Sequence, residues 1–399
     1  TTTLVRGPPM SSPASTRRRV STATAALLLA LTPIVTTPTP AKAVPLPLTG
    51  FVVANDGRIY QASGTPNGQL SLADGTVTVP PGAGISAIRQ GSGYLALFLI
   101  GTHGGIVAGT TAYNAPGLTF TLFGPSGVAT PGTKISAIST PEGVYVSFPG
   151  RNGSVYTALF GSQIKPGPVA WLSTPPGLAP STASIAASWD PTTGPNVVFV
   201  GLDGALYSAG HIATGAWTTT PISPAGVAPP GGGVAVLSDP DPDRNKKRVV
   251  YAGNDGTLWE TVLGPHPEPW LPQAISAAGV INPGAELAAT PYGPKPDPWY
   301  AAVFFADPNG AITVAANLGS GWLTPTPLTP PGLAQPGAAL ALATDPEYPV
   351  IYVGWCNNYQ WWWLYWTISP PPFQRSIYTV RSPNLIRDGA NVTVAKWNS

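Results

Sequence analysis

The chain has 399 residues, of which 43% are hydrophobic and 9% are charged, with 50 prolines, 46 glycines and one cysteine. Five of the 19 basic residues and none of the 17 acidic residues fall within residues 1–43, so the remainder carries 19 − 5 = 14 basic residues and a net charge of −3. This balance excludes the cationic surface that nucleic-acid binding requires, and a single cysteine excludes an internal disulfide framework.

The N-terminus has the three parts of an export signal. Arg17–Arg19 form a basic region, residues 25–35 hold an apolar stretch, and Ala41–Ala43 match a small-x-small cleavage site. The apolar stretch is too short to span a membrane permanently. We expect a signal region at residues 1–43 and a secreted or extracytoplasmic domain at residues 44–399, without integral membrane association. A disordered N-terminal tail is the alternative.

After this region a unit of roughly fifty residues repeats seven times. Each unit begins with an apolar run, such as Phe51–Ala54, and the run stops at a tight turn. The Asn-Gly or Asp-Gly pair in most of these turns tolerates the positive φ angles of β-hairpins, so a second strand is expected to fold straight back. The turns are at residues 55–57, 104–105, 152–153, 203–204, 255–256 and 309–310, and at Asn357-Asn358 in the seventh unit.

The second half of each unit predicts two more strands. An outer strand often starts with an aromatic residue and ends in a Pro-Gly turn; these aromatic residues are Phe120, Trp171, Trp217, Trp270 and Trp322. A strand of small and aliphatic residues follows, at 85–88, 135–138, 185–187, 234–237, 287–289, 340–342 and 392–394. These strands are apolar on both faces, which is typical of sheets covered on both sides.

Together these elements predict an all-β fold, a seven-bladed β-propeller with four-stranded blades and its smallest residues at the axis. The first unit lacks an inner strand, and the chain ends in an isolated strand of the inner type, Asn391–Val394. We therefore expect the C-terminal strand to join the N-terminal blade and close the ring, which removes two exposed sheet edges.

Catalytic and metal-binding patterns are weak in this sequence. The inner strands have only Arg89, Lys134, Glu286 and Lys396 as charged neighbours, which do not form the carboxylate pair of glycosidases. His103, His211 and His266 lack the short spacing of metal ligands. The basic run at residues 244–248 is balanced by nearby aspartates and is interpreted as a solvated loop. We expect no catalytic residues, no metal and no cofactor.

The aromatic turn of the seventh unit is the sharpest binding candidate. Exposed tryptophans beside amides suit sugars, because flat rings cover apolar C–H faces and amides bond hydroxyls. The candidate ligand-binding residues are Trp355, Asn357, Asn358, Tyr359 and Trp361. Trp355 and Tyr359 flank the turn and are expected to be the most exposed. The alternative is that these rings are core, because both faces of a blade are covered.

The hairpins resemble those of a known family. Asp203–Tyr207 and Asp255–Trp259, each followed by a tryptophan, are similar to the repeats of bacterial and invertebrate propeller lectins, the tectonin/tachylectin group and the seven-bladed bacterial lectins. The resemblance covers about residues 50–397, although the first two units lack the tryptophan. It implies sugar binding between or within blades, without catalysis.

The first functional hypothesis is accordingly a monomeric, non-catalytic protein with lectin-like carbohydrate binding, whose partner is a glycan or cell-surface ligand. A protein-interaction or cell-surface scaffold is the second hypothesis, and a polysaccharide lyase or glycoside hydrolase is the third. An exposed Trp/Asn pocket favours the first, a broad apolar patch the second, and a buried acid–base pair the third.

Overall fold

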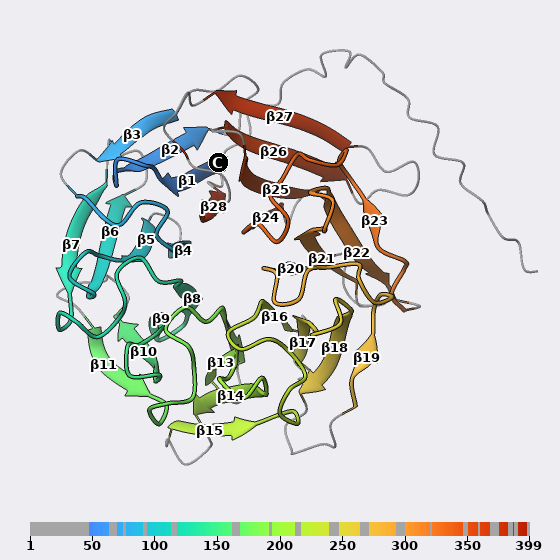
Figure 1. Cartoon of the computed structure of the whole chain (residues 1–399). Coiled ribbons are helices and arrows are strands. Elements are labelled where there is room, and N and C mark those ends of the chain that lie inside the picture. The colour runs from blue at the N-terminus through green and yellow to red at the C-terminus, as the bar shows by residue number, and fades with distance from the viewer. Residues whose placement is uncertain are drawn as a thin grey trace, which may run out of the picture. The chain divides into compact units, whose positions relative to one another are not determined.

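The structure is a computed structural model that describes residues 48–63, 70–74, 77–90, 94–112, 118–161, 168–190, 194–211, 217–238, 247–263, 271–292, 300–319, 321–345, 350–357, 360–367, 375–381, 386 and 390–396. These residues form seven four-stranded antiparallel sheets arranged as the blades of a ring (Figure 1). No helix among them is long and apolar enough to cross a membrane. The predicted seven-bladed propeller is confirmed.

The first four blades contain the following strands, given from the axis outward. Blade 1 is β28 (Val392–Lys396), β1 (Leu48–Val53), β2 (Ile59–Ser63) and β3 (Leu70–Asp74). Blade 2 is β4 (Ile85–Gln90), β5 (Tyr94–Ile100), β6 (Ile106–Ala112) and β7 (Thr119–Phe123). Blade 3 is β8 (Ser136–Thr140), β9 (Gly143–Pro149), β10 (Val155–Phe160) and β11 (Pro168–Ser173). Blade 4 is β12 (Ile185–Asp190), β13 (Gly194–Val200), β14 (Leu206–His211) and β15 (Trp217–Pro221).

The last three blades follow the same order. Blade 5 is β16 (Val234–Ser238), β17 (Lys247–Ala252), β18 (Leu258–Leu263) and β19 (Gln273–Ala274). Blade 6 is β20 (Ala288–Tyr292), β21 (Tyr300–Ala306), β22 (Ile312–Leu318) and β23 (Thr326–Pro327). Blade 7 is β24 (Ala341–Asp345), β25 (Val350–Asn357), β26 (Gln360–Thr367) and β27 (Arg375–Arg381).

The ring closes as expected, because β28 pairs with β1 at Gly50–Val394 and neighbouring positions. β28 is also tied to blade 2. Thr393 Oγ1 accepts the Ala87 N–H at 2.8 Å, and Asn391 Nδ2 donates to the Gly82 carbonyl at 3.0 Å. The C-terminal strand therefore links blades 1 and 2 as well as completing blade 1.

The outer strands of blades 5 and 6 are only two residues long. Trp322 does not open β23 as predicted; it forms an isolated bridge with Asn317 instead. Proline lacks the N–H that a sheet ladder needs, and Pro272, Pro325 and Pro327 lie in or beside these two strands. The prolines therefore confine pairing to a few residues at this part of the rim.

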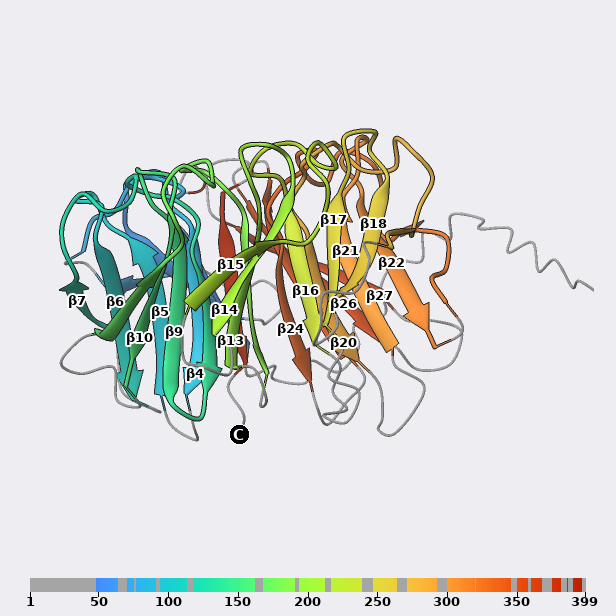
Figure 2. The same ribbon diagram turned by 90° about the horizontal axis from the view of Figure 1, so that it is seen from below.

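Six blades share one hairpin geometry between their second and third strands. In each, the N–H of a first residue bonds the carbonyl four residues later, and the intervening glycine has a φ of 73° to 78°. The glycine carbonyl then accepts an N–H from the connection to the next blade; the donors are Val79, Ala129, Ala179, Ala228, Ile281 and Ala334. These hairpins and connections crowd together along one face of the ring (Figure 2).

The core lies between the blades rather than within a single centre. Each blade-to-blade interface is a separate apolar cluster built from the alternating side chains of both sheets. Polar groups that enter these interfaces therefore lie in apolar surroundings.

Candidate functional site

The predicted aromatic turn of blade 7 is mostly buried. Trp355 and Trp361 are both 0% exposed, so neither ring offers a surface to a ligand, and the expectation that Trp355 is exposed is wrong. Trp355 donates its Nε1–H to the Leu333 carbonyl at 2.6 Å and stacks on Trp362 within the interface between blades 6 and 7. Both faces of blade 7 are covered, which explains why the flanking position is not exposed.

The amide of the same turn is also used structurally. Asn357 is 2% exposed and donates from Nδ2 to the Gly332 carbonyl at 3.1 Å. Its Oδ1 faces the Gln335 amide at 3.4 Å. Asn358 and Tyr359 lie outside the described residues. The described part of this turn therefore acts as packing, which was the alternative interpretation of the tryptophans.

The histidines do not converge within the described part of the chain. His103 lies in the hairpin of blade 2, and His211 ends β14, where it pairs with Trp217 across the ladder. His266 is outside the described residues. Among those that are described, no three His, Cys, Asp or Glu side chains come close enough together to hold a metal ion.

A charged group lies where the inner strands begin. Lys134 precedes β8 of blade 3, Glu286 precedes β20 of blade 6, and the two side chains form an ion pair. Ser184, at the start of blade 4, donates its hydroxyl to the other Glu286 oxygen at 2.9 Å. Burial lowers the pKa of Lys134 from 10.5 to about 8. The group contains one carboxylate, so it does not supply the carboxylate pair of a glycosidase.

A second polar group lies between blades 5 and 6, formed by Arg248, Glu260 and Trp322. Glu260 on β18 is 2% exposed and faces blade 6. Arg248 Nη1 on β17 lies 3.0 Å and 3.1 Å from its two oxygens. Trp322 of blade 6 donates its indole N–H to Glu260 Oε2 at 2.9 Å. Hydrogen bonds to a charged carboxylate are stronger than neutral ones, so they hold these three side chains in a defined arrangement.

This group reaches the surface through Arg248, whose side chain is 30% exposed, and through Val262, which is 38% exposed. Val262 lies directly opposite Arg248 in the β17–β18 ladder. The arrangement therefore offers a guanidinium, an indole and an aliphatic surface at the outer part of one interface, and the buried Glu260 carboxylate fixes the first two. Together these groups can bind a polar ring with one apolar edge.

The corresponding positions of the other glycine hairpins carry no such charges. Arg248 lies eight residues before the hairpin glycine Gly256, and Glu260 lies four residues after it. The equivalent pairs are Thr49/Gln61, Ala96/Ala108, Tyr145/Thr157, Asn196/Ser208 and Ala302/Val314. Asn196 donates its amide to Ser208 at 2.7 Å, so blade 4 has a neutral version of the pair. The ionic pair belongs to blade 5 alone among these six hairpins.

Sequence reasoning missed this group. The basic run at 244–248 was interpreted as a solvated loop, which is wrong for its described residues. Lys247 and Arg248 lie in β17, and Lys247 is 8% exposed, with its Nζ 3.9 Å from Asp190 Oδ2. The available signal was Glu260 inside the otherwise uncharged strand Leu258–Leu263. A carboxylate buried in a blade needs a partner, and only the strand register reveals Arg248.

Comparison with known proteins agrees with this architecture. No protein-family model and no curated protein sequence matches the chain. Among solved structures it is similar to the BP39L lectin from Burkholderia pseudomallei, with 23% identity over 84% of this chain and 96% of that one and a TM-score of 0.70.

Two further solved structures are similar, and one of them is a lectin. The SapL1 lectin, solved in complex with alpha-methyl fucoside, has 18% identity over 75% of this chain and 96% of that one, with a TM-score of 0.55. AofleA from Arthrobotrys oligospora has 13% identity over 79% and 90%, with a TM-score of 0.55. At these identities the likeness shows the fold.

Proposed function

We propose that this protein is a non-catalytic, lectin-like carbohydrate-binding propeller whose sugar site is the Arg248–Glu260–Trp322 group. The observation that carries the proposal is the buried Glu260 carboxylate, which is held by an arginine and by an indole from the next blade. A buried ion pair seldom adds stability over apolar packing of the same volume, so a pair that reaches the surface through Arg248 points to a binding role.

The chemistry of the group suits a monosaccharide. The partly exposed guanidinium donates to hydroxyl or ring oxygens and the indole packs on the C–H face, while the buried Glu260 carboxylate holds both in place. Val262 adds an apolar contact beside Arg248. A sugar whose edge carries a methyl group in place of a hydroxymethyl group would bury that methyl against Val262, so we place 6-deoxyhexoses first.

The similar structures support the same ligand class. The SapL1 lectin was solved with alpha-methyl fucoside, and another similar structure, the six-bladed Aleuria aurantia lectin, is described as having a novel fucose recognition mode.

The test is a glycan array followed by calorimetric titration of the purified protein with methyl α-fucoside. Saturable binding by the unmodified protein and its loss in Arg248→Ala and Trp322→Phe would support the site. Arg151→Ala is the matched control, because Arg151 is an exposed arginine in the hairpin of blade 3. If Arg248→Ala binds every array sugar as well as the unmodified protein does, the site is wrong. If no glycan binds, a protein-interaction scaffold becomes the leading hypothesis.

The proposal includes export, because the three-part signal at residues 1–43 precedes the propeller and a secreted or extracytoplasmic lectin meets its glycans outside the cell. Intact mass of the protein recovered from the culture medium of an expressing host tests this step. Retention of the uncleaved chain inside the cell would contradict it.

A further inference from the structure

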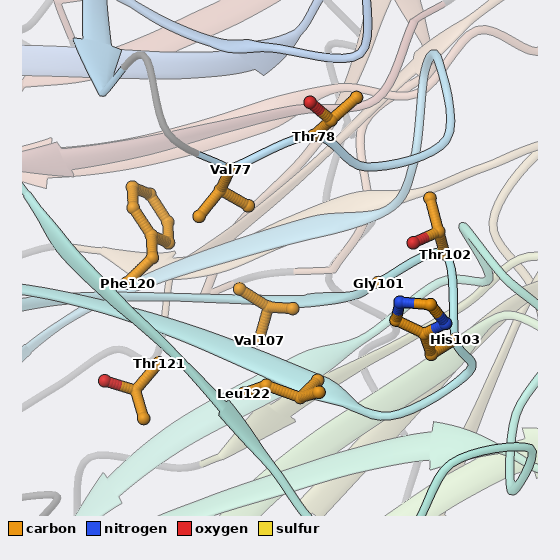
Figure 3. A pocket seen from close by; sticks show the side chains of 9 residues that line it. All are labelled: Val77, Thr78, Gly101, Thr102, His103, Val107, Phe120, Thr121 and Leu122. Carbon is orange, nitrogen blue, oxygen red and sulfur yellow. The ribbon is translucent and has the colours of Figure 1, made fainter.

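A surface cavity of about 210 Å³ lies beside the hairpin of blade 2. Figure 3 shows the side chains that line it. Val107 and Phe120 come from β6 and β7, Gly101 and His103 from the hairpin between β5 and β6, and Val77 from the connection that follows blade 1. The remaining lining residues are Thr78, Thr102, Thr121 and Leu122. The walls are aliphatic and aromatic, and the rim is polar.

The other hairpins show why this space is open. Each hairpin begins at the residue whose N–H bonds the carbonyl four residues later, for example Gly201 in blade 4. Six residues after this start a large ring is found in four blades: Tyr60 in blade 1, Tyr156 in blade 3, Tyr207 in blade 4 and Trp259 in blade 5. In blade 2 the same position is Val107. In blades 3, 4 and 5 the large ring lies over the first residue of the hairpin, which is a glycine. A Cβ added to Gly201, for instance, would approach the Tyr207 ring to 2.5 Å.

The tyrosine hydroxyls have a fixed partner, the third residue of the same hairpin. Tyr60 donates to Asp56 at 2.9 Å and Tyr207 donates to Asp203 at 3.0 Å. Partial burial, followed by these hydrogen bonds, raises the pKa of both tyrosines. In blade 3 Asn152 bonds the Tyr156 hydroxyl at 3.0 Å. The residue at this position in blade 2 is His103.

Blade 6 fills the same space differently. Its hairpin begins with Asp307, whose carboxylate accepts from the Thr313 hydroxyl at 3.2 Å and from the Ala311 N–H at 2.9 Å. Thr313 occupies the position of Val107. Blade 2 combines a glycine at the start of its hairpin, Gly101, with a small side chain six residues later, Val107. Among the six glycine hairpins only blade 2 has this combination, and the cavity lies beside it.

We propose that the blade 2 cavity is a binding site for a 4-hydroxyphenyl group, which takes the place of the tyrosine found in blades 1, 3 and 4. The ring would pack against Val107 and Phe120, and its hydroxyl would donate to the His103 imidazole as the tyrosines donate to aspartate. An apolar cavity of about 150 Å³ is enough to bind benzene, so the blade 2 cavity has room for a phenol. The site shares no residue with the sugar site and does not depend on it.

The test is a calorimetric titration of the full chain with 4-methylphenol. One molecule is expected to bind, and toluene is expected to bind about twofold to tenfold more weakly, the effect of one neutral hydrogen bond. His103→Ala should lower the affinity for 4-methylphenol to that for toluene. N-acetyltyrosinamide then distinguishes a tyrosine side chain of a peptide from a small phenol as the source of the group.

Two double variants decide whether the cavity is the site. His103→Asp with Val107→Tyr reproduces the pair of blades 1 and 4 and should abolish binding while the melting temperature stays equal or rises. Asp203→His with Tyr207→Val, the matched change in blade 4, should create a second binding site. The proposal would be overturned if the first double variant still binds 4-methylphenol, or if the second double variant folds but shows no second binding site. Displacement of 4-methylphenol by methyl α-fucoside that persists in Arg248→Ala would instead make the cavity a second sugar subsite.

Discussion

Two interfaces of this ring have the same backbone geometry and opposite chemistry. Glu260 lies opposite Val250, which pairs with Ala235, four residues after the turn glycine Gly231. Trp363 lies opposite Gly354, which pairs with Ala341, four residues after Gly337. Glu260 and Trp363 are therefore equivalent positions, and by the same register Arg248 corresponds to Tyr352.

The blade 7 interface is filled by aromatic rings. Trp361 and Trp363 lie 5.3 Å apart between ring centroids and cover Gly50 of blade 1 so closely that an added Cβ would approach Trp361 to 2.3 Å. The blade 5 interface places an ion pair at the equivalent positions, with Arg248 partly exposed. The same fold therefore uses one interface to close the ring and another to present polar groups, and the difference is carried by a few side chains.

Removal of β28 is expected to have the largest effect on the aromatic interface. Deleting residues 390–399 takes the inner strand from blade 1 and the Val392 contact from the aromatic interface, and it exposes the edge of β1. We expect loss of the cooperative thermal unfolding transition, measured by calorimetry. A truncated protein with an unchanged melting temperature would contradict the closure described above.

Removing one ring tests the packing role of blade 7. Trp363→Ala should lower the free energy of unfolding by about 3–5 kcal/mol, because it leaves a large cavity in a buried interface. Urea titration measures this change. Trp171→Ala is the control, since Trp171 is 38% exposed and should cost clearly less. Equal losses in the two variants would argue against a special role for the blade 7 rings.

Removing one charge tests the polar interface. Glu260→Ala removes the carboxylate that lies 3.0 Å and 3.1 Å from Arg248 Nη1 and should destabilise the protein by about 3 kcal/mol. The double variant Arg248→Met/Glu260→Leu makes this interface apolar, like that of blade 7, and should restore stability without restoring sugar binding. If the double variant is as unstable as Glu260→Ala, the ion pair is needed for folding rather than for binding.

The smallest expected effect concerns the group at the start of the inner strands. The pKa of Lys134 is about 8 in the folded protein and about 10.4 in an unfolded chain. Between these values the unfolded state binds more protons, so the free energy of unfolding should rise as the pH rises above 8. Urea titrations at pH 7.5 and 9.5 measure the rise, and Lys134→Met should reduce it.

The control for this experiment is Lys247→Met. Burial also lowers the pKa of Lys247, with nearby Asp190 opposing the shift, so this lysine contributes a rise of the same sign. If Lys134→Met leaves the whole rise in place, Lys134 keeps its ordinary pKa in the folded protein. Measurements stay below pH 10, where tyrosines of the unfolded chain begin to lose protons.

Much of the architecture could be read from the sequence because it depends on local rules. Glycines such as Gly204 and Gly256 have positive φ angles in tight turns, and the residues on either side pair at once with their neighbours. The small strand at Asn391–Val394 had no partner nearby in sequence, so ring closure with the first blade followed. These inferences need only the pleat period and the turn chemistry.

The candidate site could not be read in the same way. Composition does not distinguish a tryptophan that packs on Gly50 from one that contacts a ligand. For that reason the sequence predicts an exposed Trp355, although the ring is buried. Arg248 and Glu260 are separated by a hairpin, and Trp322 comes from the next blade, 62 residues after Glu260. Their meeting depends on how strands stack between blades, which is a long-range property.

The number of blades, their turns and the closing strand follow from the amino-acid sequence alone, because each repeat encodes its own backbone geometry. Which side chains meet across an interface depends on the folded ring: an aromatic cluster is buried at blade 7, an ion pair lies at blade 5 and a cavity is open at blade 2. Hairpin geometry is set within a few residues, whereas burial and charge pairing are set by the neighbouring blade in space.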